Sequence, residues 1–89
     1  MVRQHLLIKG NVQGVSYRKS AKRKAEELRV NGWVRNLPTG EVEACVEGSH
    51  SAVTMLADWC RQGPPRSTVE EVVMEQEEFR NEFSQFEIR

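Results

Sequence analysis

Apolar residues return along this chain at two different spacings, and each spacing predicts a different kind of element. Between residues 17 and 30 they recur every three or four positions with charged residues between them, which predicts an amphipathic helix. The apolar members of this helix are Tyr17, Ala21, Ala25 and Leu28. Asn31 and Gly32 both tolerate the left-handed backbone conformation, so they are predicted to end the helix.

A second helix is predicted over residues 51–62. Its apolar stripe consists of Val53, Leu56, Trp59 and Cys60. Ser49 or Ser51 can cap its N-terminus, and the run Gly63-Pro64-Pro65 is expected to end it.

Residues 41–48 alternate strictly and are predicted to form a strand. Val42, Ala44 and Val46 point to one side, and Glu41, Glu43, Cys45 and Glu47 point to the other, which we expect to face water. The turn Pro38-Thr39-Gly40 makes this strand the second arm of a hairpin with residues 33–37. Residues 3–9, 69–76 and 83–89 are also predicted to be strands, with a turn at 80–82.

The predicted order is therefore β-α-β-β-α-β with one additional C-terminal strand. This order is typical of an α+β, ferredoxin-like sandwich, an antiparallel sheet with two helices on one face. Residues 1–89 are expected to form a single domain, because one hydrophobic core suffices for this length. The fold alone does not determine the function.

Composition excludes several classes of protein. No apolar run approaches the length of a membrane span, and the N-terminus does not resemble a signal peptide, so we expect a cytoplasmic protein with no membrane partner. The two cysteines, Cys45 and Cys60, are too few for a disulfide framework or a zinc site. We expect Cys60 in the core and Cys45 on the acidic face, where neighbouring glutamates would disfavour its thiolate.

The net charge is zero, but it is unevenly distributed. Residues 1–36 hold nine Lys or Arg and two Glu, a net charge of +7, and residues 37–89 have a net charge of −7. Such asymmetry favours an anion site in the basic part, although two solvated faces of opposite sign would look the same in the sequence.

The segment from Gly10 to Arg18 carries the clearest chemical signal. Gly10 and Gly14 lie between a predicted strand and a predicted helix, where glycine allows successive N–H groups to turn toward one point. The helix N-terminus adds partial positive charge. Arg18, in the first turn, can donate two hydrogen bonds to one anion. Together these features predict a small cup for a tetrahedral dianion.

Two known phosphate sites are absent from this segment. The sequence GxxxxGK[ST] of nucleotide-binding loops does not occur. The cysteine phosphatases carry a cysteine six positions before the arginine, and here that position is Val12, which has no nucleophilic atom. If phosphate is cleaved here, attack by water is the simplest interpretation.

Two stretches resemble the acylphosphatase family. Residues 8–18 (IKGNVQGVSYR) are similar to its first signature, and residues 32–48 (GWVRNLPTGEVEACVEG) are similar to its second. The similarity extends over nearly the whole chain, including Trp59 and the terminal FEIR. It implies the ferredoxin-like fold and hydrolysis of the carboxyl-phosphate bond of acyl phosphates, without a metal, another cofactor or a phosphoenzyme.

The resemblance also assigns roles to individual residues. Arg18 matches the arginine that binds the substrate phosphate, and Asn36 matches the asparagine that orients the attacking water. The backbone amides of the phosphate loop would be those of Val12, Gln13, Gly14, Val15, Ser16 and Tyr17. The implied partners are a small acyl phosphate and its product, inorganic phosphate, bound by a monomer.

Three positions depart from the usual family pattern. Asn11 stands where arginine is frequent, Ser16 where glycine or cysteine is often found, and Tyr17 where phenylalanine is usual. None of these changes removes a residue to which the resemblance assigns chemistry.

Three other interpretations remain at this stage. An RNA-binding module would share the order of elements, but the strand that would stack bases carries glutamates here, so no nucleic-acid partner is expected. A non-catalytic anion-binding or regulatory domain would not need both Arg18 and Asn36. A fragment of a larger carbamoyl-transferring maturation protein is disfavoured by the start at Met1 and the complete predicted fold.

Overall fold

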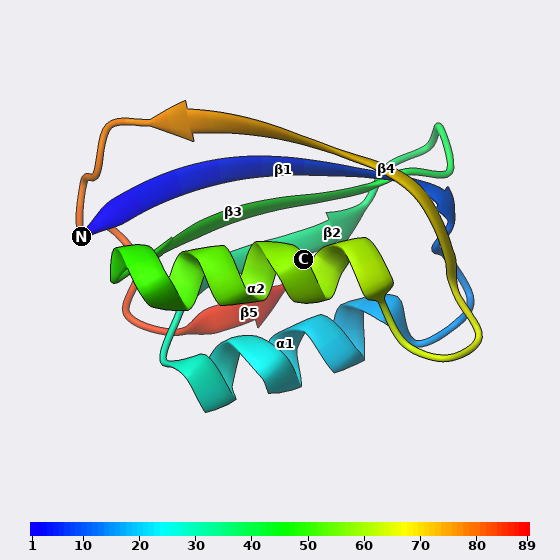
Figure 1. Ribbon diagram of the computed structural model, residues 1–89, viewed down its shortest axis with the longest axis horizontal. Coiled ribbons are helices and arrows are strands. Elements are labelled where there is room, and N and C mark those ends of the chain that lie inside the picture. The colour runs from blue at the N-terminus through cyan, green and yellow to red at the C-terminus, as the bar shows by residue number, and fades with distance from the viewer.

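Five strands form one sheet, and both helices cover the same face of it (Figure 1). The computed structural model describes residues 1–89. Its elements are β1 (Val2–Asn11), α1 (Tyr17–Leu28), β2 (Asn31–Asn36), β3 (Val42–Gly48), α2 (His50–Gln62), β4 (Thr68–Glu77) and β5 (Phe86–Ile88). The strand order is β4-β1-β3-β2-β5. The predicted order of elements and the ferredoxin-like sandwich are confirmed.

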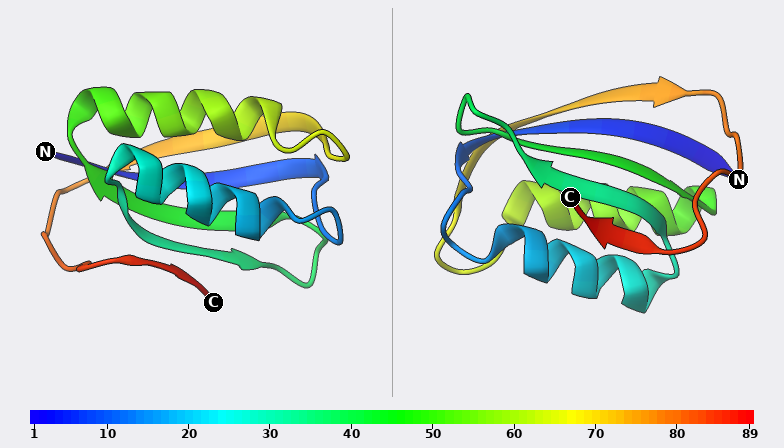
Figure 2. Two further views of the ribbon diagram at one scale, coloured as in Figure 1. Left: turned by 90° about the horizontal axis from the view of Figure 1, so that it is seen from below. Right: turned by 180° about the vertical axis from the view of Figure 1, so that it is seen from behind.

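The sheet is mixed rather than antiparallel, because β5 pairs in parallel with β2. The other three strand pairs are antiparallel, as the sequence predicts. Residues 78–85 run from the end of β4 across the end of the sheet to its opposite edge (Figure 2). The predicted turn at 80–82 lies within this crossing segment, so β4 and β5 do not form a hairpin.

The end of α1 differs from the prediction. The helix stops at Leu28, and Arg29 adopts the left-handed conformation with φ 60°. The amides of Arg29 and Val30 donate to the carbonyls of Glu26 and Ala25, which is the Schellman pattern. Val30 is buried against the core, so packing rather than a glycine ends this helix.

Asn31 and Gly32, predicted to end α1, begin β2 instead. Gly32 has φ 147°, and a Cβ at this position would lie 2.0 Å from the main-chain oxygen of Cys45. Glycine is therefore required here by the close approach of β3, not by a helix end.

The core lies between the helices and the covered face of the sheet. Its strand residues are Leu6, Ile8, Val34, Val42, Ala44, Val46 and Phe86. Its helix residues are Tyr17, Ala21, Ala25, Val53, Leu56 and Cys60. The alternation predicted for residues 41–48 is confirmed on the helix-covered side of β3. Ser49 is the N-cap of α2, and its Oγ accepts a hydrogen bond from the Ala52 amide. Neither helix is long and apolar enough to cross a membrane.

The opposite side of β3 is not open to water at every predicted position. Cys45 is only 2% exposed and Glu47 only 3%. The Glu47 carboxylate accepts hydrogen bonds from the amides of Arg80, Asn81 and Glu82 at 2.8, 3.2 and 3.1 Å. The crossing segment therefore covers the acidic end of this face, which the alternation alone could not indicate.

The two cysteines are free and buried. Cys60 lies in the core, as predicted, and burial raises its pKa to about 11. The pKa of Cys45 is also raised, as predicted, but burial is the main cause, and the nearby Arg3 opposes the contribution of the glutamates.

Candidate active site

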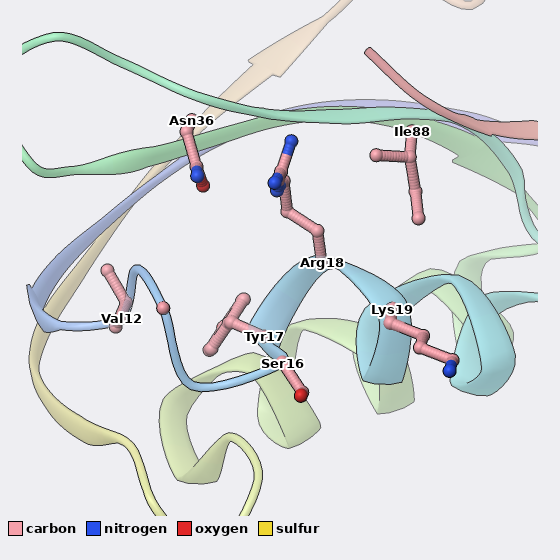
Figure 3. Close-up of a pocket in the computed structure, with 8 residues that line it drawn as sticks. Val12, Ser16, Tyr17, Arg18, Lys19, Asn36 and Ile88 are labelled. Atoms are coloured by element: carbon pink, nitrogen blue, oxygen red, sulfur yellow. The ribbon is translucent and has the colours of Figure 1, made fainter.

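The predicted site residues lie near the carboxyl ends of two strands, at one end of the sheet. β1 and β2 both pair antiparallel with β3, so they run in the same direction and their carboxyl ends lie on the same side. The loop that follows β1 leads into α1, and β2 ends at Asn36. Between them lies a pocket of about 170 Å³ (Figure 3). It is lined by Val12, Gly14, Ser16, Tyr17, Arg18, Lys19, Asn36 and Ile88.

The loop between β1 and α1 has an unusual backbone. Gly10 and Gly14 have φ values of 129° and 74°, so both adopt positive-φ conformations that favour glycine. Ser16 has φ 63° as well, although it is not a glycine. A Cβ on Gly10 would lie 2.1 Å from the main-chain oxygen of Thr68, whereas one on Gly14 would meet nothing within 4 Å. Gly14 is therefore explained by its backbone conformation and not by lack of space.

The N-terminus of α1 faces the pocket without being neutralised by the protein itself. Ser16 is the N-cap residue, but its side chain makes no capping hydrogen bond. No acidic residue lies in the first turn. The first N–H groups of a helix lack partners inside the helix and carry partial positive charge, so this terminus favours an anion.

Arg18 extends from the first turn of α1 into the same space as Asn36 (Figure 3). Its Nη1 donates to the main-chain oxygen of Arg89 at 3.5 Å, a long contact. No Asp or Glu side chain pairs with Arg18, whereas Arg3, Arg35, Arg61 and Arg89 each have such a partner. The positive charge of Arg18 is therefore available to an anion in the pocket.

Asn36 presents an unusual polar atom. Since it is two residues beyond Val34 on β2, its side chain lies on the helix-covered face, past the end of the core. Its Oδ1 is buried and has no hydrogen-bond partner within the protein. A buried acceptor without a partner costs about 1–3 kcal/mol, so this oxygen requires a donor that the chain does not supply.

Tyr17 holds the start of α1 against α2. Its hydroxyl donates to the main-chain oxygen of Cys60 at 2.7 Å, and its ring lies 5.6 Å from that of Trp59. Burial raises the pKa of Tyr17 far above its usual value, so the hydroxyl stays protonated and remains a donor. The departure from phenylalanine at this position thus adds a hydrogen bond between the two helices.

The structure brings together most of the residues that the sequence singled out. Of the predicted loop, Val12, Gly14, Ser16 and Tyr17 line the pocket with Arg18 and Asn36. Gln13 and Val15 do not line it: Gln13 bonds to the β2–β3 turn and Val15 packs against the core. His5 bonds to Glu43 on the opposite face of the sheet, and His50 is exposed at the start of α2.

Two pocket residues were missed by the sequence analysis. Lys19 follows Arg18 on α1, and in the sequence its charge alone does not distinguish it from Lys22 or Arg23. Ile88 reaches the pocket only because β5 pairs with β2, and no local pattern indicates that pairing. No group of three or more His, Cys, Asp or Glu side chains is placed to hold a metal ion.

A ferredoxin-like sandwich, with a glycine-containing loop and an arginine without an acidic partner at a pocket beside its first helix, defines a class of small α+β domains with a candidate anion site. Comparison with known proteins makes this class specific. The sequence model of the acylphosphatase family matches residues 4–88. This chain belongs to the acylphosphatase family.

Individual relatives agree with this membership. An acylphosphatase of Geobacter metallireducens is 43% identical, over 99% of this chain and 95% of the relative. One from Aeropyrum pernix is 49% identical, over 100% and 89% respectively. Among solved structures, an acylphosphatase from Bacillus subtilis superposes with a TM-score of 0.96 at 27% identity, covering 100% of this chain and 99% of that one.

Proposed function

We propose that this protein hydrolyses acyl phosphates to a carboxylate and inorganic phosphate by direct attack of water on phosphorus. The phosphate group would sit in the cup formed by the amides of residues 12–17, the N-terminus of α1 and the Arg18 guanidinium. The attacking water would be held by Asn36. Membership of the acylphosphatase family supports the reaction, and the pocket geometry supports the assignment of roles.

The unpartnered Oδ1 of Asn36 is the observation that carries the proposal. A water molecule can donate one hydrogen bond to this oxygen and accept another from the amide nitrogen of the same side chain. These two bonds would fix the position and the orientation of the water beside the phosphate. An asparagine does not take up a proton, so Asn36 orients the water and does not act as a base.

The chemical step needs few groups because the leaving group is good. The water oxygen forms a bond to phosphorus while the bond from phosphorus to the acyl oxygen breaks, and the electron pair leaves with the carboxylate. One proton of the water passes to a phosphate oxygen of the substrate. The protein therefore contributes positioning and charge stabilisation, which suffice for most phosphoryl transfers.

Main-chain amides and one guanidinium would complement the negative charge of the phosphate. The equatorial oxygens gain negative charge as the transition state forms, and preorganised donors aimed at them are each worth about 3–4 kcal/mol. Because these donors are part of the fold, the proposed reaction needs no metal or other cofactor to complete it.

We also propose that residues 1–89 act as one monomeric domain in the cytoplasm. The pocket is complete within one chain, so the proposed reaction does not require a second copy. The two unpaired cysteines are typical of a reducing compartment.

The test of this function is hydrolysis of benzoyl phosphate in the presence of EDTA. We expect turnover by the wild type, and a fall in kcat/KM of about 10³-fold for Arg18→Ala, because the variant loses a charged donor to the phosphate. Arg23→Ala is the matched control, since Arg23 is exposed on the same helix and does not line the pocket. The proposal is wrong if the wild type is inactive, or if Arg18→Ala keeps the rate of the control.

The attacked atom can be identified by running the reaction in ¹⁸O-labelled water. Attack on phosphorus places the label in inorganic phosphate and leaves the benzoate unlabelled. Label in the benzoate would show attack on the carbonyl carbon and would overturn the proposed mechanism.

A further inference from the structure

Gln13 lies in the phosphate loop but does not line the pocket. Its half-buried side chain instead reaches the turn between β2 and β3. Nε2 donates to the main-chain oxygen of Leu37 at 2.8 Å and to that of Glu41 at 2.9 Å. Both acceptors are carbonyl oxygens, which cannot donate, so the amide nitrogen and not the oxygen must face the turn.

The two acceptors close the tip of the hairpin. The amide of Leu37 donates to the carbonyl of Glu41, and the amide of Gly40 donates to that of Leu37. The β2–β3 ladder ends at the pair Asn36 and Val42, so the tip extends beyond the sheet. Leu37 directly follows Asn36, and any movement of the tip would therefore move the Asn36 side chain.

No other hydrogen bond joins the loop of residues 12–16 to the hairpin tip of residues 36–41. Lys9, on β1, forms a partly exposed ion pair with Glu41 at 3.9 Å. Such an exposed pair contributes little to holding a geometry. Beyond the strand pairing of the sheet, the Gln13 carboxamide is thus the hydrogen-bonded link between the cup and the hairpin tip.

We infer that Gln13 is a positioning residue that fixes Asn36, at the tip of β2, relative to the phosphate cup. This inference rests on the proposed function, since it concerns the distance between the seated phosphate and the water that attacks it. The Gln13 side chain would touch neither the phosphate nor the water, and only its main-chain amide belongs to the proposed cup. A displacement of about 1 Å between reacting groups can lower a rate about 100-fold, which is the scale on which such a tether would act.

The first test is Gln13→Met, which keeps the length of the side chain and removes both donors. We expect kcat for benzoyl phosphate to fall by roughly tenfold to 100-fold, while the inhibition constant of inorganic phosphate stays within about twofold. The cup itself is intact in this variant, so product binding should persist. Gln76→Met is the matched control, because Gln76 is exposed on β4 and makes no side-chain hydrogen bond.

A double variant separates positioning from general loosening of the fold. If Gln13 acts through Asn36, Gln13→Met lowers kcat in the wild type but causes no further loss in the Asn36→Ala background. Losses that multiply in the double variant would overturn the inference. Weakening of phosphate binding in step with kcat would also overturn it, because Gln13 would then shape the cup rather than place the hairpin.

A second variant keeps the inference testable if the methionine of Gln13→Met does not pack well. Gln13→Glu has the same shape, but its carboxylate oxygens face the carbonyl oxygens of Leu37 and Glu41. We expect a kcat below that of Gln13→Met at pH 7, rising relative to the wild type as the pH falls, because the protonated acid regains one donor. A ratio to the wild type that does not change with pH contradicts the inference.

The proposed function and this inference fail in different ways. An inactive wild type removes the function. A fully active wild type with a fully active Gln13→Met variant leaves the function in place and removes only the role of Gln13.

Discussion

At the scale of single residues, the site is built from backbone conformations that ordinary side chains rarely adopt. Gly14 has φ 74°, and Ser16, two residues later, has φ 63°. A non-glycine residue in the left-handed region costs about 1 kcal/mol or more, and such residues are common at functional sites. The strain at Ser16 turns the chain sharply, so that the first N–H groups of α1 face the pocket.

This strain gives a prediction at Ser16. The variant Ser16→Gly should be more stable by about 0.5–1 kcal/mol, because relief of the left-handed conformation outweighs the greater entropy loss of glycine. The measurement is urea unfolding followed by circular dichroism. The serine side chain makes no capping hydrogen bond that would be lost. A variant less stable than the wild type would show that Ser16 is not strained.

Arg18 and Asn36, to which we assign side-chain roles, both line the pocket, and the sequence pointed to each of them. Arg18 follows a glycine loop at a helix start, whereas Asn36 lies in the predicted strand 33–37 before a turn, and its role is implied by the family resemblance. Ile88 and the Gln13 contacts could not be predicted, since both depend on strands that meet only in the folded chain. Local sequence patterns indicate which residues can take part in chemistry, but they do not indicate which elements lie close together in the folded chain.

At the scale of elements, the crossing segment of residues 78–85 is the least predictable part of the fold. It has no regular structure, and its path is set by the buried Glu47 carboxylate, which accepts three main-chain N–H groups. Arg3 contacts Glu47, Glu77 and Glu82. This cluster holds the segment over the end of β3 and so directs β5 to the edge beside β2, where Ile88 reaches the pocket. The sequence places Glu47 correctly on the strand but gives no sign of what covers it.

Glu47 therefore makes the fold sensitive to acid. Burial tends to raise the pKa of Glu47, but the amides of Arg80 and Glu82 and the nearby Arg3 outweigh it and lower the pKa overall. A carboxyl group with a lowered pKa in the folded state stabilises the protein above its unfolded pKa. This contribution is lost as the pH falls through the folded value.

We expect Glu47→Gln to reduce the free energy of unfolding by about 1–3 kcal/mol at pH 7. The difference from the wild type should shrink as the pH falls below the ordinary pKa of a glutamate, about 4.3, and through the lowered value of the folded state. Glu78→Gln is the control, since Glu78 is exposed and makes no hydrogen bond or ion pair through its side chain. A difference that stays constant from pH 7 to pH 3 would contradict this account.

At the scale of the whole molecule, the uneven charge of the sequence becomes an uneven charge of the surface. The basic helix α1 and the acidic strand β4 lie on opposite sides of the molecule (Figure 1). The pocket is at the N-terminus of α1, at the positive end of this separation. A field of this kind attracts a dianionic substrate toward the cup and weakens as salt is added.

The electrostatic attraction of the substrate should make kcat/KM depend on the salt concentration. For benzoyl phosphate, kcat/KM should fall roughly threefold to tenfold as the ionic strength rises from about 0.01 M to about 0.15 M. The value of kcat itself should change little, because the donors around the bound phosphate are part of the fold. A kcat/KM that does not respond to salt would show that the charge separation has no role in substrate capture.

The overall order of elements and the core were predictable because two periodicities, of two and of about 3.6 residues, decide them. The end of α1 was not, because it is set by the packing of Val30 rather than by the neighbouring asparagine and glycine.

The central claim is that binding and attack are divided between Arg18 and Asn36, and the variant Asn36→Ala tests it most directly. The measurement pairs kcat for benzoyl phosphate with the inhibition constant of inorganic phosphate. We expect kcat to fall by about 100-fold or more while phosphate inhibits as in the wild type within about twofold, because the cup is intact and only the water is lost. An unchanged kcat, or an equal loss of turnover and phosphate binding, would contradict the account.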